Sequence, residues 1–217
     1  MNPSQLSTRE RILEYAGDMF GKKGFKSTTI RMIAQEAGVN VAAVNYHFRD
    51  KEGLYAEVIE DIFSKGFARF PSLDPKSDPA MSAEDRLKLF IRGTIYRILS
   101  PEGWGGLNGK GRLIAREMME PTSAFTQVIE TYIRPHKDRL VAILWEIVGK
   151  GARQEDILLS VVSILGQCIY YVYATSIIER VAPEYTPVEN NIDKIIDHVF
   201  RFSLGGLENI KADKEIA

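Results

Sequence analysis

Residues 28–51, TTIRMIAQEAGVNVAAVNYHFRDK, decide the fold because they contain two short amphipathic helices around a glycine turn. Apolar residues recur at helical spacing in the first half, and Gly38 follows as a residue that readily adopts the left-handed conformation at a helix end. In the second half, Val39, Val44 and Phe48 give the next helix its own apolar face. The pattern predicts a helix-turn-helix, whose second helix enters the major groove of DNA.

Residues that favour helix starts stand at each expected boundary around this stretch. Residues 7–10, STRE, form a capping box, and the helix that they open is expected to stop at the glycines of 21–24, GKKG. The expected caps of the next three helices are Thr28 or Thr29, then Asn40, then Asp50. Together these helices predict a compact reader domain.

The rest of the chain predicts long helices and no convincing strand. The helix after Asp50 runs towards Phe70 and precedes the proline-rich loop 71–79, PSLDPKSDP. Further helices are expected over 82–98, 113–120, 122–148, 154–181 and 192–204. Pro135 is expected to bend the helix over 122–148. No repeat with a period of 20–50 residues occurs, so the chain predicts a helical bundle rather than a solenoid.

The fold class that we predict is therefore all-α. Residues 1–52 are expected to form an N-terminal three-helix, helix-turn-helix DNA-binding domain. Residues 53–210 are expected to form a larger C-terminal helical bundle for ligand binding and dimerisation, and residues 211–217 a tail. The segment 100–111, SPEGWGGLNGKG, is expected to be a mobile connector or lid; it matches neither GxGxxG nor GxxxxGK[ST], which disfavours a nucleotide loop.

Composition narrows the function. The formal net charge is −1, from 28 basic and 29 acidic residues, which excludes a strongly basic protein that coats nucleic acid. Residues 1–55 hold eight Lys or Arg and six Asp or Glu, so any basic surface is local. A single cysteine, Cys168, excludes an internal disulfide and a multi-cysteine metal cluster. The N-terminus lacks the apolar core of a signal peptide, and 157–178 is interrupted by polar residues, so we expect a cytoplasmic chain without a membrane span.

Residues 8–55 resemble the tetracycline-repressor family of transcriptional regulators. The resemblance is carried by MFGKKGFKSTTIRMIAQEAGV at 19–39 and by NVAAVNYHFRDKEGLY at 40–55. Two short later blocks, REMMEPTSAF at 116–125 and LGQCIYYVYA at 165–174, resemble a subfamily known from a regulator of sensitivity to cefoperazone and chloramphenicol. The resemblance implies a DNA-binding regulator with a divergent effector domain and no cofactor.

The resemblance also implies a set of DNA-contacting residues, and their chemistry suits it. Phosphate contacts are expected from the hydroxyl, phenol, imidazole and ammonium donors, with Arg31 reaching either a guanine edge or a phosphate. The full expected set is Thr29, Arg31, Asn40, Val41, Ala42, Ala43, Asn45, Tyr46, His47 and Lys51. The alternatives are a plain cap for Thr29, an unpartnered surface arginine for Arg31, a core aromatic for Tyr46 and a packed histidine for His47.

The expected base-reading surface is sparse. Val41, Ala42 and Ala43 are small and apolar, so they can pack on thymine methyl groups but cannot hydrogen bond to bases. Asn45 can pair with adenine or hold a phosphate. Family members often have threonine where this chain has Ala43 and tyrosine where it has Asn45. Specificity is therefore expected to depend on methyl contacts and on DNA shape.

A small amphipathic or aromatic effector is expected between the C-terminal helices, because aromatic, soft and polar side chains gather there. The expected ligand-binding residues are Tyr96, Trp104, Arg116, Met119, His136, Gln167 and Tyr171, with Met118, Phe125, Cys168 and Tyr173 in a wider set. The alternative for each aromatic or methionine is a place in the core. For Arg116 it is a salt bridge to Glu117 or Glu120.

One reader contacts too few base pairs for specificity in a genome, so a homodimer on a palindromic operator is expected. The apolar stripes of the last two helices are the candidate interface, with the core of the same chain as the alternative. These stripes are Ile157, Val161, Leu165, Ile169 and Val172, and then Ile192, Ile195, Ile196, Val199 and Phe200.

The function predicted is thus a ligand-responsive regulator, a repressor released when its effector shifts the fourth helix and changes the spacing of the two readers. The alternative is an adaptor on the same fold without operator binding, suggested by the apolar recognition helix. An enzyme built on Cys168 and His136 is disfavoured, because the cysteine lies in an apolar helix and the three histidines lack metal-binding spacing.

Overall fold

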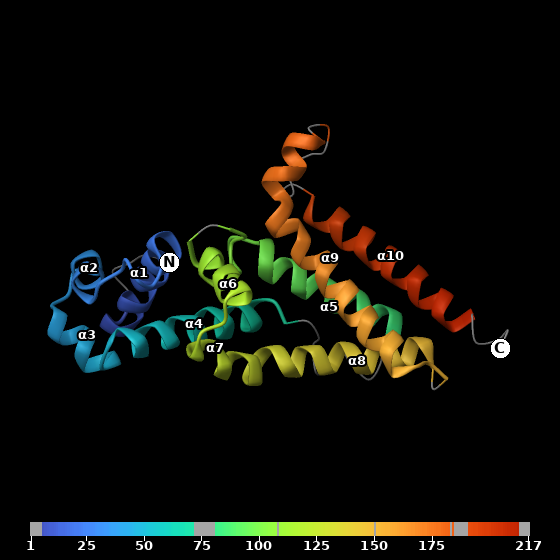
Figure 1. Cartoon of the computed structure of the whole chain (residues 1–217), viewed down its shortest axis with the longest axis horizontal. Helices are drawn as coiled ribbons and strands as arrows, with labels where there is room; N and C mark the ends of the chain where they lie inside the picture. Colours follow the sequence, from blue (N-terminus) through green and yellow to red (C-terminus); the bar gives the residue numbers. More distant parts are fainter. Residues whose placement is uncertain are drawn as a thin grey trace.

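The computed structural model describes residues 6–71, 81–107, 109–149, 151–182, 184 and 191–212, and these residues contain helices and no strand. Figure 1 shows helices α1 to α3 at one end of an elongated molecule and helices α5, α8, α9 and α10 at the other. The elements are α1 (Thr8–Lys23), α2 (Ile30–Glu36), α3 (Val41–Phe48), α4 (Lys51–Arg69), α5 (Ala83–Leu99), α6 (Gly109–Met119), α7 (Ser123–Val128), the π-helical turn η3 (Ile129–Ile133), α8 (Arg134–Val148), α9 (Gln154–Val181) and α10 (Ile192–Ala212).

The N-terminal helices begin at the capping residues that the sequence predicts. Ser7 and Glu10 form both bonds of a capping box at α1. Thr29, rather than Thr28, caps α2, because its hydroxyl oxygen accepts from the Met32 amide at 3.2 Å. The carboxamide of Asn40 and the carboxylate of Asp50 cap α3 and α4 in the same way. Thr28 is buried instead, and its hydroxyl donates to the Gly24 carbonyl at 2.8 Å.

Two hydrophobic clusters make up the core of the described part of the chain. The first is centred on Phe20, Ile33, Val44, Phe48 and neighbouring residues of α1 to α4, and it also includes Leu113, Ile114, Phe125 and Val128 from α6 and α7. The second joins α5, α8, α9 and α10 around side chains such as those of Phe90, Leu144, Ile164 and Val199. Helix α4 therefore packs with the reader beyond residue 52, and the boundary expected there stays a prediction.

The helical stretch 123–148 changes its winding just before Pro135. The ring of Pro135 removes the amide hydrogen that an α-helix needs at that position. The five residues of η3 adopt π-helical geometry, and the amide of Arg134 donates to the carbonyl of Ile129. A π-helical turn thus leads directly into the proline, and the expected bend at Pro135 stays a prediction. Helix α6 begins four residues earlier than expected, and α10 continues to Ala212.

Helix α9 packs with α5, α8 and α10, and its last turns project from the body in Figure 1. Ile157, Val161 and Val172 are buried in the core of the same chain, and so are Ile195 and Val199 of α10. The core alternative is therefore correct for these residues. Residues 154–175 are long and apolar enough to cross a membrane by composition, but a core helix of a soluble protein passes the same test. The part of α9 that faces outward carries Leu158, Leu159, Val162, Tyr170, Ile177 and Val181.

The glycine-rich connector is folded against its neighbours over its described residues, 100–107. The amide of Trp104 donates to the Arg97 carbonyl at 2.7 Å, and that of Gly106 to the Ile98 carbonyl at 2.9 Å. Gly105 and Gly106 have φ of 73° and 61°, which other residues rarely adopt. These turns place the Trp104 side chain between α4 and α5.

Candidate functional site

Helix α3 has one buried and one exposed face. Val44 and Phe48 point into the reader's core. On the other face, Val41, Ala42 and Asn45 are exposed, Ala43 is half-buried, and the carboxamide oxygen of Asn40 accepts from the Ala43 amide at 2.7 Å. Because that oxygen is occupied by the cap, the NH2 group of Asn40 is the part that faces outward with donors to offer. The surface is small, apolar and accessible, as the base-reading prediction requires.

Donor groups flank this face. The Tyr46 side chain is 85% exposed, so the core alternative for it is wrong. His47 is half-buried, with its ring edge-on to Tyr46 at a centroid distance of 5.3 Å. The Lys51 ammonium lies 4.2 Å from the centre of the Phe25 ring at the start of α4. Thr29 and Arg31 are exposed at the start of α2. As a cap, Thr29 uses its oxygen as acceptor, and its hydroxyl hydrogen stays available to a phosphate.

The junction of α3 with α4 is tightly built. Arg49 has φ 66° and ψ −62°, and the Asp50 amide donates to the Phe48 carbonyl at 2.8 Å, which closes a strained γ-turn. A β-carbon at Gly53 would lie 2.5 Å from the Phe48 carbonyl oxygen. Only glycine allows this approach, so Gly53 fixes the direction of α3 relative to α4. Sequence reasoning missed this residue, although a glycine in the first turn of an otherwise regular helix was a usable signal.

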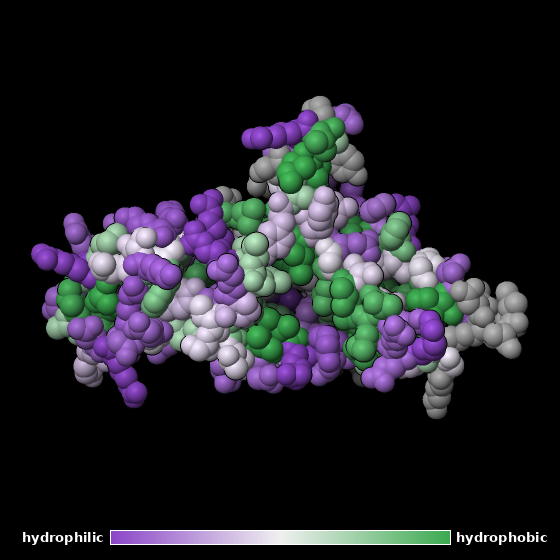
Figure 2. Space-filling model, viewed as in Figure 1, coloured by the Kyte–Doolittle hydropathy of each residue, from purple (hydrophilic) through white to green (hydrophobic). Residues whose placement is uncertain are grey.

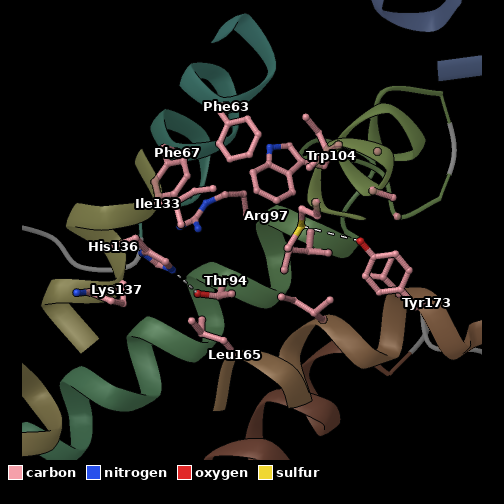
Figure 3. A pocket seen from close by; sticks show the side chains of 18 residues that line it. Phe63, Phe67, Thr94, Arg97, Trp104, Ile133, His136, Lys137, Leu165 and Tyr173 are labelled. Carbon is pink, nitrogen blue, oxygen red and sulfur yellow. Dashed lines mark hydrogen bonds between the residues drawn. The ribbon is translucent and has the colours of Figure 1, made fainter. Parts of the chain in front are cut away.

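A cavity of ≈ 130 Å³ lies between α4, α5, α6, α8 and α9. Figure 3 shows its side chains converging from these helices and from the connector that carries Trp104. Aromatic and aliphatic side chains dominate the lining. It consists of Phe63, Phe67, Thr94, Arg97, Ile98, Trp104, Gly106, Gly111, Ile114, Ala115, Met118, Ile133, His136, Lys137, Leu165, Ile169, Val172 and Tyr173.

Arg97, Thr94 and His136 form the polar end of the cavity. The Arg97 side chain stacks its guanidinium 3.6 Å from the centre of the Phe67 ring and donates to the Phe70 carbonyl at 2.9 Å. The Thr94 hydroxyl donates to the Phe90 carbonyl at 2.8 Å, so its oxygen accepts from Nε2 of His136 at 3.0 Å. Burial lowers the pKa of Arg97 to about 9, and burial together with the positive charge of Arg97 lowers the pKa of His136 to about 3. At neutral pH the arginine is charged and the histidine is not.

Trp104 connects the cavity to α4. Its indole nitrogen donates to the Ile62 carbonyl at 3.3 Å, and its ring centre lies 4.6 Å from that of Phe63. A β-carbon at Gly66 would lie 2.5 Å from the same nitrogen. The absence of a side chain at Gly66 therefore lets the indole pack against the backbone of α4. Displacement of the indole therefore moves α4 or breaks these contacts.

Helix α6 links the cavity to the reader. Its Ile114, Ala115 and Met118 line the cavity. Lys110 pairs with Glu14 of α1 at 2.6 Å. At Gly21 the α1 backbone lies so close to Gly109 that a β-carbon would be 2.6 Å from the Gly109 carbonyl carbon.

Of the residues expected around the ligand, Trp104 and His136 line the cavity, as do Met118 and Tyr173 from the wider set. The other five residues of the main set lie elsewhere, and Phe125 and Cys168 of the wider set are buried in the first and second hydrophobic clusters. The Tyr96 hydroxyl donates to Asp193 at 3.0 Å, and Met119 is 76% exposed. Gln167 and Tyr171 border surface grooves along α9.

Arg116 has neither of the two roles that the sequence suggested for it. It donates to the Phe20 carbonyl of α1 at 3.1 Å, so neither the ligand contact nor the salt bridge to Glu117 or Glu120 describes it. Glu117 instead accepts from the buried Tyr55 hydroxyl at 2.6 Å. Cys168 is buried in the second cluster, and burial raises the pKa of its thiol to about 12, which keeps it protonated and unreactive.

Sequence reasoning also missed Arg97, which is 1% exposed. Its signal was present: position 97 is three residues after Thr94 and seven after Phe90, on the apolar face of α5. An arginine on that face can only be buried, and a buried cation needs a reason.

Comparison with known proteins agrees with this architecture. The profile described as "Bacterial regulatory proteins, tetR family" matches residues 12–58, and that of "HTH-type transcriptional dual regulator CecR, C-terminal domain" matches residues 83–207. The second match covers more than half of the chain, which therefore belongs to the tetR family with a CecR-type C-terminal domain. The protein is a DNA-binding transcriptional regulator.

Individual relatives point the same way. The chain is 40% identical to the regulatory protein RaaS of Mycobacterium tuberculosis over 158 residues, which are 70% of this chain and 72% of the relative. It is 27% identical to the dual regulator CecR of Shigella flexneri, over 75% of this chain and 74% of CecR. Among solved structures, the fatty acid degradation regulator FadR from Bacillus halodurans shares the fold, with a TM-score of 0.63 and 17% identity over 92% of this chain and 96% of FadR.

Proposed function

We propose that this regulator is a repressor that holds a palindromic operator as a homodimer and releases it when a small molecule enters the cavity. The observation that carries the proposal is that α4 and α6 each touch both the cavity and the reader. Helix α4 contributes Phe63 and Phe67 to the cavity and meets α3 at Gly53. Helix α6 lines the cavity on one side and packs on α1 on the other.

The size of the cavity explains how occupancy reaches the DNA. A volume of ≈ 130 Å³ holds a single ring, and a larger effector must displace part of the lining. The Trp104 side chain is bonded to the backbone of α4 through the Ile62 carbonyl, so its displacement shifts α4 and reorients α3. Because packed interiors switch between discrete arrangements, a small shift of α4 moves α3 as well and is not absorbed by the side chains between them. By linkage, operator DNA weakens effector binding by the same factor by which the effector weakens DNA binding.

The proposed DNA contacts follow the exposed groups of α2, α3 and the start of α4. Phosphates are contacted by Thr29, Tyr46, His47 and Lys51, and a phosphate or a guanine edge by Arg31. Asn40, Val41, Ala42, Ala43 and Asn45 face the bases. With so few hydrogen-bonding groups towards the bases, recognition relies on thymine methyl groups and on DNA shape.

The proposed dimer interface is the outward side of α9 with α10. Figure 2 shows apolar side chains exposed on this part of the molecule, including the end of α9 that projects from the body. The exposed residues Val162, Tyr170 and Ile177 of α9 and Phe202 of α10 contribute to it. Large apolar side chains gathered on one face are typical of an interface between subunits. We further propose a cytoplasmic location, where the DNA lies, with no membrane contact and no catalytic role.

The test of DNA binding uses fluorescence anisotropy with DNA from upstream of the protein's own gene and with a scrambled duplex. Lys51→Ala removes a proposed phosphate contact. It is expected to weaken binding to both duplexes by the same factor and, because a homodimer loses two such contacts, to reduce the slope of log affinity against log salt by about 1.8. Lys88→Ala is the matched control, because it removes the same charge from α5, where Lys88 pairs with Asp197; it should change neither quantity.

Two results would count against the proposal. Loss of affinity for the upstream duplex alone in Lys51→Ala would show that Lys51 reads sequence instead of holding the backbone. If the wild-type protein did not prefer the upstream duplex at any moderate salt concentration, the upstream DNA would contain no operator for this protein.

A further inference from the structure

The side-chain donors that line the cavity differ in the atoms to which they are bonded. Of the described lining residues with a side-chain hydrogen to donate, all but one have an oxygen of the protein as partner. These pairs are Thr94 with the Phe90 carbonyl, Arg97 with the Phe70 carbonyl, Trp104 with the Ile62 carbonyl, His136 with the Thr94 hydroxyl and Lys137 with the Asp138 carboxylate. The exception is Tyr173, whose hydroxyl donates to the sulfur of Met118 at 3.9 Å.

The bond between Tyr173 and Met118 is a weak one, because a thioether sulfur is a poor acceptor. Figure 3 shows this bond as a dashed line from the Tyr173 hydroxyl, on the side of the cavity opposite His136 and Lys137. Burial raises the pKa of Tyr173, so the phenol keeps its hydrogen at neutral pH. A ligand oxygen at this position therefore gives the hydroxyl a better acceptor than the one it leaves.

The lining also bears on the charge of a ligand. Its charged side chains, Arg97 and Lys137, are both cations, and no described lining residue is a carboxylate. An ammonium group would thus enter a cavity that holds positive charge and offers it no counter-charge. A carboxylate beside Tyr173 would exchange its hydration shell for a single neutral donor among apolar side chains, which is unfavourable. An uncharged oxygen loses much less hydration and needs only one donor.

We propose that the cavity binds an uncharged molecule with a single ring or a short alkyl body and one carbonyl or ether oxygen, which accepts the hydrogen of Tyr173 in place of the Met118 sulfur. The proposal rests on the effector role of the cavity given above. An apolar cavity of about 150 Å³ accepts benzene, so a volume of ≈ 130 Å³ suits a body of that size. The oxygen fixes the orientation of the ligand, and the apolar lining supplies the rest of the contact.

Isothermal titration calorimetry of the full-length protein with acetophenone, ethylbenzene and benzoate tests the class of ligand. Acetophenone presents a ketone oxygen, ethylbenzene has the ring and a short alkyl group without oxygen, and benzoate carries a charge. Tyr173→Phe is expected to weaken acetophenone binding by about three- to ten-fold, the contribution of one neutral hydrogen bond, without weakening ethylbenzene binding. Because each compound is compared between two proteins, the different hydration of the compounds cancels.

Tyr170→Phe is the matched control for this variant. It removes the same hydroxyl from the same helix, at a residue that is 60% exposed and outside the lining of the cavity. The affinities for acetophenone and ethylbenzene should both stay at their wild-type values.

Two results with the wild type would overturn the proposed class of ligand, and neither depends on a variant: no acetophenone binding at millimolar concentration, or tighter binding of benzoate than of acetophenone. An equal loss of affinity for acetophenone and ethylbenzene in Tyr173→Phe would overturn the role of the hydroxyl.

DNA anisotropy with the same compounds keeps this proposal apart from the proposed function. Acetophenone that bound as expected, but equally well with and without operator, would refute the effector role of the cavity and leave the class of ligand standing. Release of operator by benzoate but not by acetophenone would refute the uncharged ligand and leave the effector-released repressor standing.

Discussion

Replacing Gly21 by alanine tests whether α1 and α6 are held together backbone to backbone. The new β-carbon would lie 2.6 Å from the Gly109 carbonyl carbon and overlap its oxygen, whereas real β-carbons essentially never come within 3.0 Å of another heavy atom. The two elements must therefore move apart by roughly 1 Å, and overpacking of this kind costs up to about 3 kcal/mol when backbone is the obstacle.

Part of that cost is offset, because alanine is favoured over glycine inside a helix by about 1 kcal/mol. The net loss in the free energy of unfolding is about 2 kcal/mol, which lowers Tm by about 4–8 °C for a chain of this size. The assay is thermal unfolding followed by circular dichroism at one fixed protein concentration, since a dimer's Tm depends on concentration.

Gly205→Ala in α10 is the matched control, because a β-carbon there meets no atom within 4 Å. The same helix preference, acting alone, should raise the Tm of this variant by about 2–4 °C. If Gly21→Ala were as stable as the wild type while Gly205→Ala gained stability, α1 and α6 could not be in backbone contact, and the proposed route from cavity to reader through α6 would be lost.

Two further perturbations follow from the geometry. Gly53→Ala places a β-carbon 2.5 Å from the Phe48 carbonyl oxygen, so α3 must turn away from α4; DNA anisotropy should show weaker binding to every duplex, and unchanged binding would mean that the junction is soft. Because the pKa of His136 is lowered to about 3 in the folded protein, the unfolded chain takes up a proton below pH 6.5 that the folded protein refuses. The free energy of unfolding should then fall by about 2 kcal/mol by pH 5, and urea titrations should show this component missing in His136→Phe.

The sequence was sufficient for features that neighbouring residues determine. Helix caps at Ser7, Asn40 and Asp50 need only a side chain three residues before the amide that it serves, so they can be predicted from local patterns. The turn at Gly38, with φ of 64°, follows from the conformational freedom of glycine in the same way.

Features that depend on residues far apart in the chain could not be predicted from the sequence. Tyr96, Gln167 and Tyr171 have suitable chemistry for a ligand, but the rotation of α5 and α9 about their axes turns them away from the cavity. Arg116 bonds to the backbone of α1 because α6 packs closely against that helix. This close packing is possible because Gly21 and Gly109, about ninety residues apart in sequence, have no side chains. Only the three-dimensional packing decides which face of an all-round apolar helix such as α9 meets which neighbour.

The sharing of the reader's core with α6 and α7 has a consequence for biosynthesis. Leu113, Phe125 and Val128 complete the cluster around α1 to α4, yet Phe63, the last residue that α4 gives to it, is synthesised 65 residues before Val128. At about 5–20 residues per second, roughly 3–13 s separate their appearance at the ribosome. During that interval the nascent helix-turn-helix has an open apolar side, so folding of the DNA-binding end waits for the effector domain to begin, and a chain interrupted before α7 leaves that side exposed to chaperones and proteases.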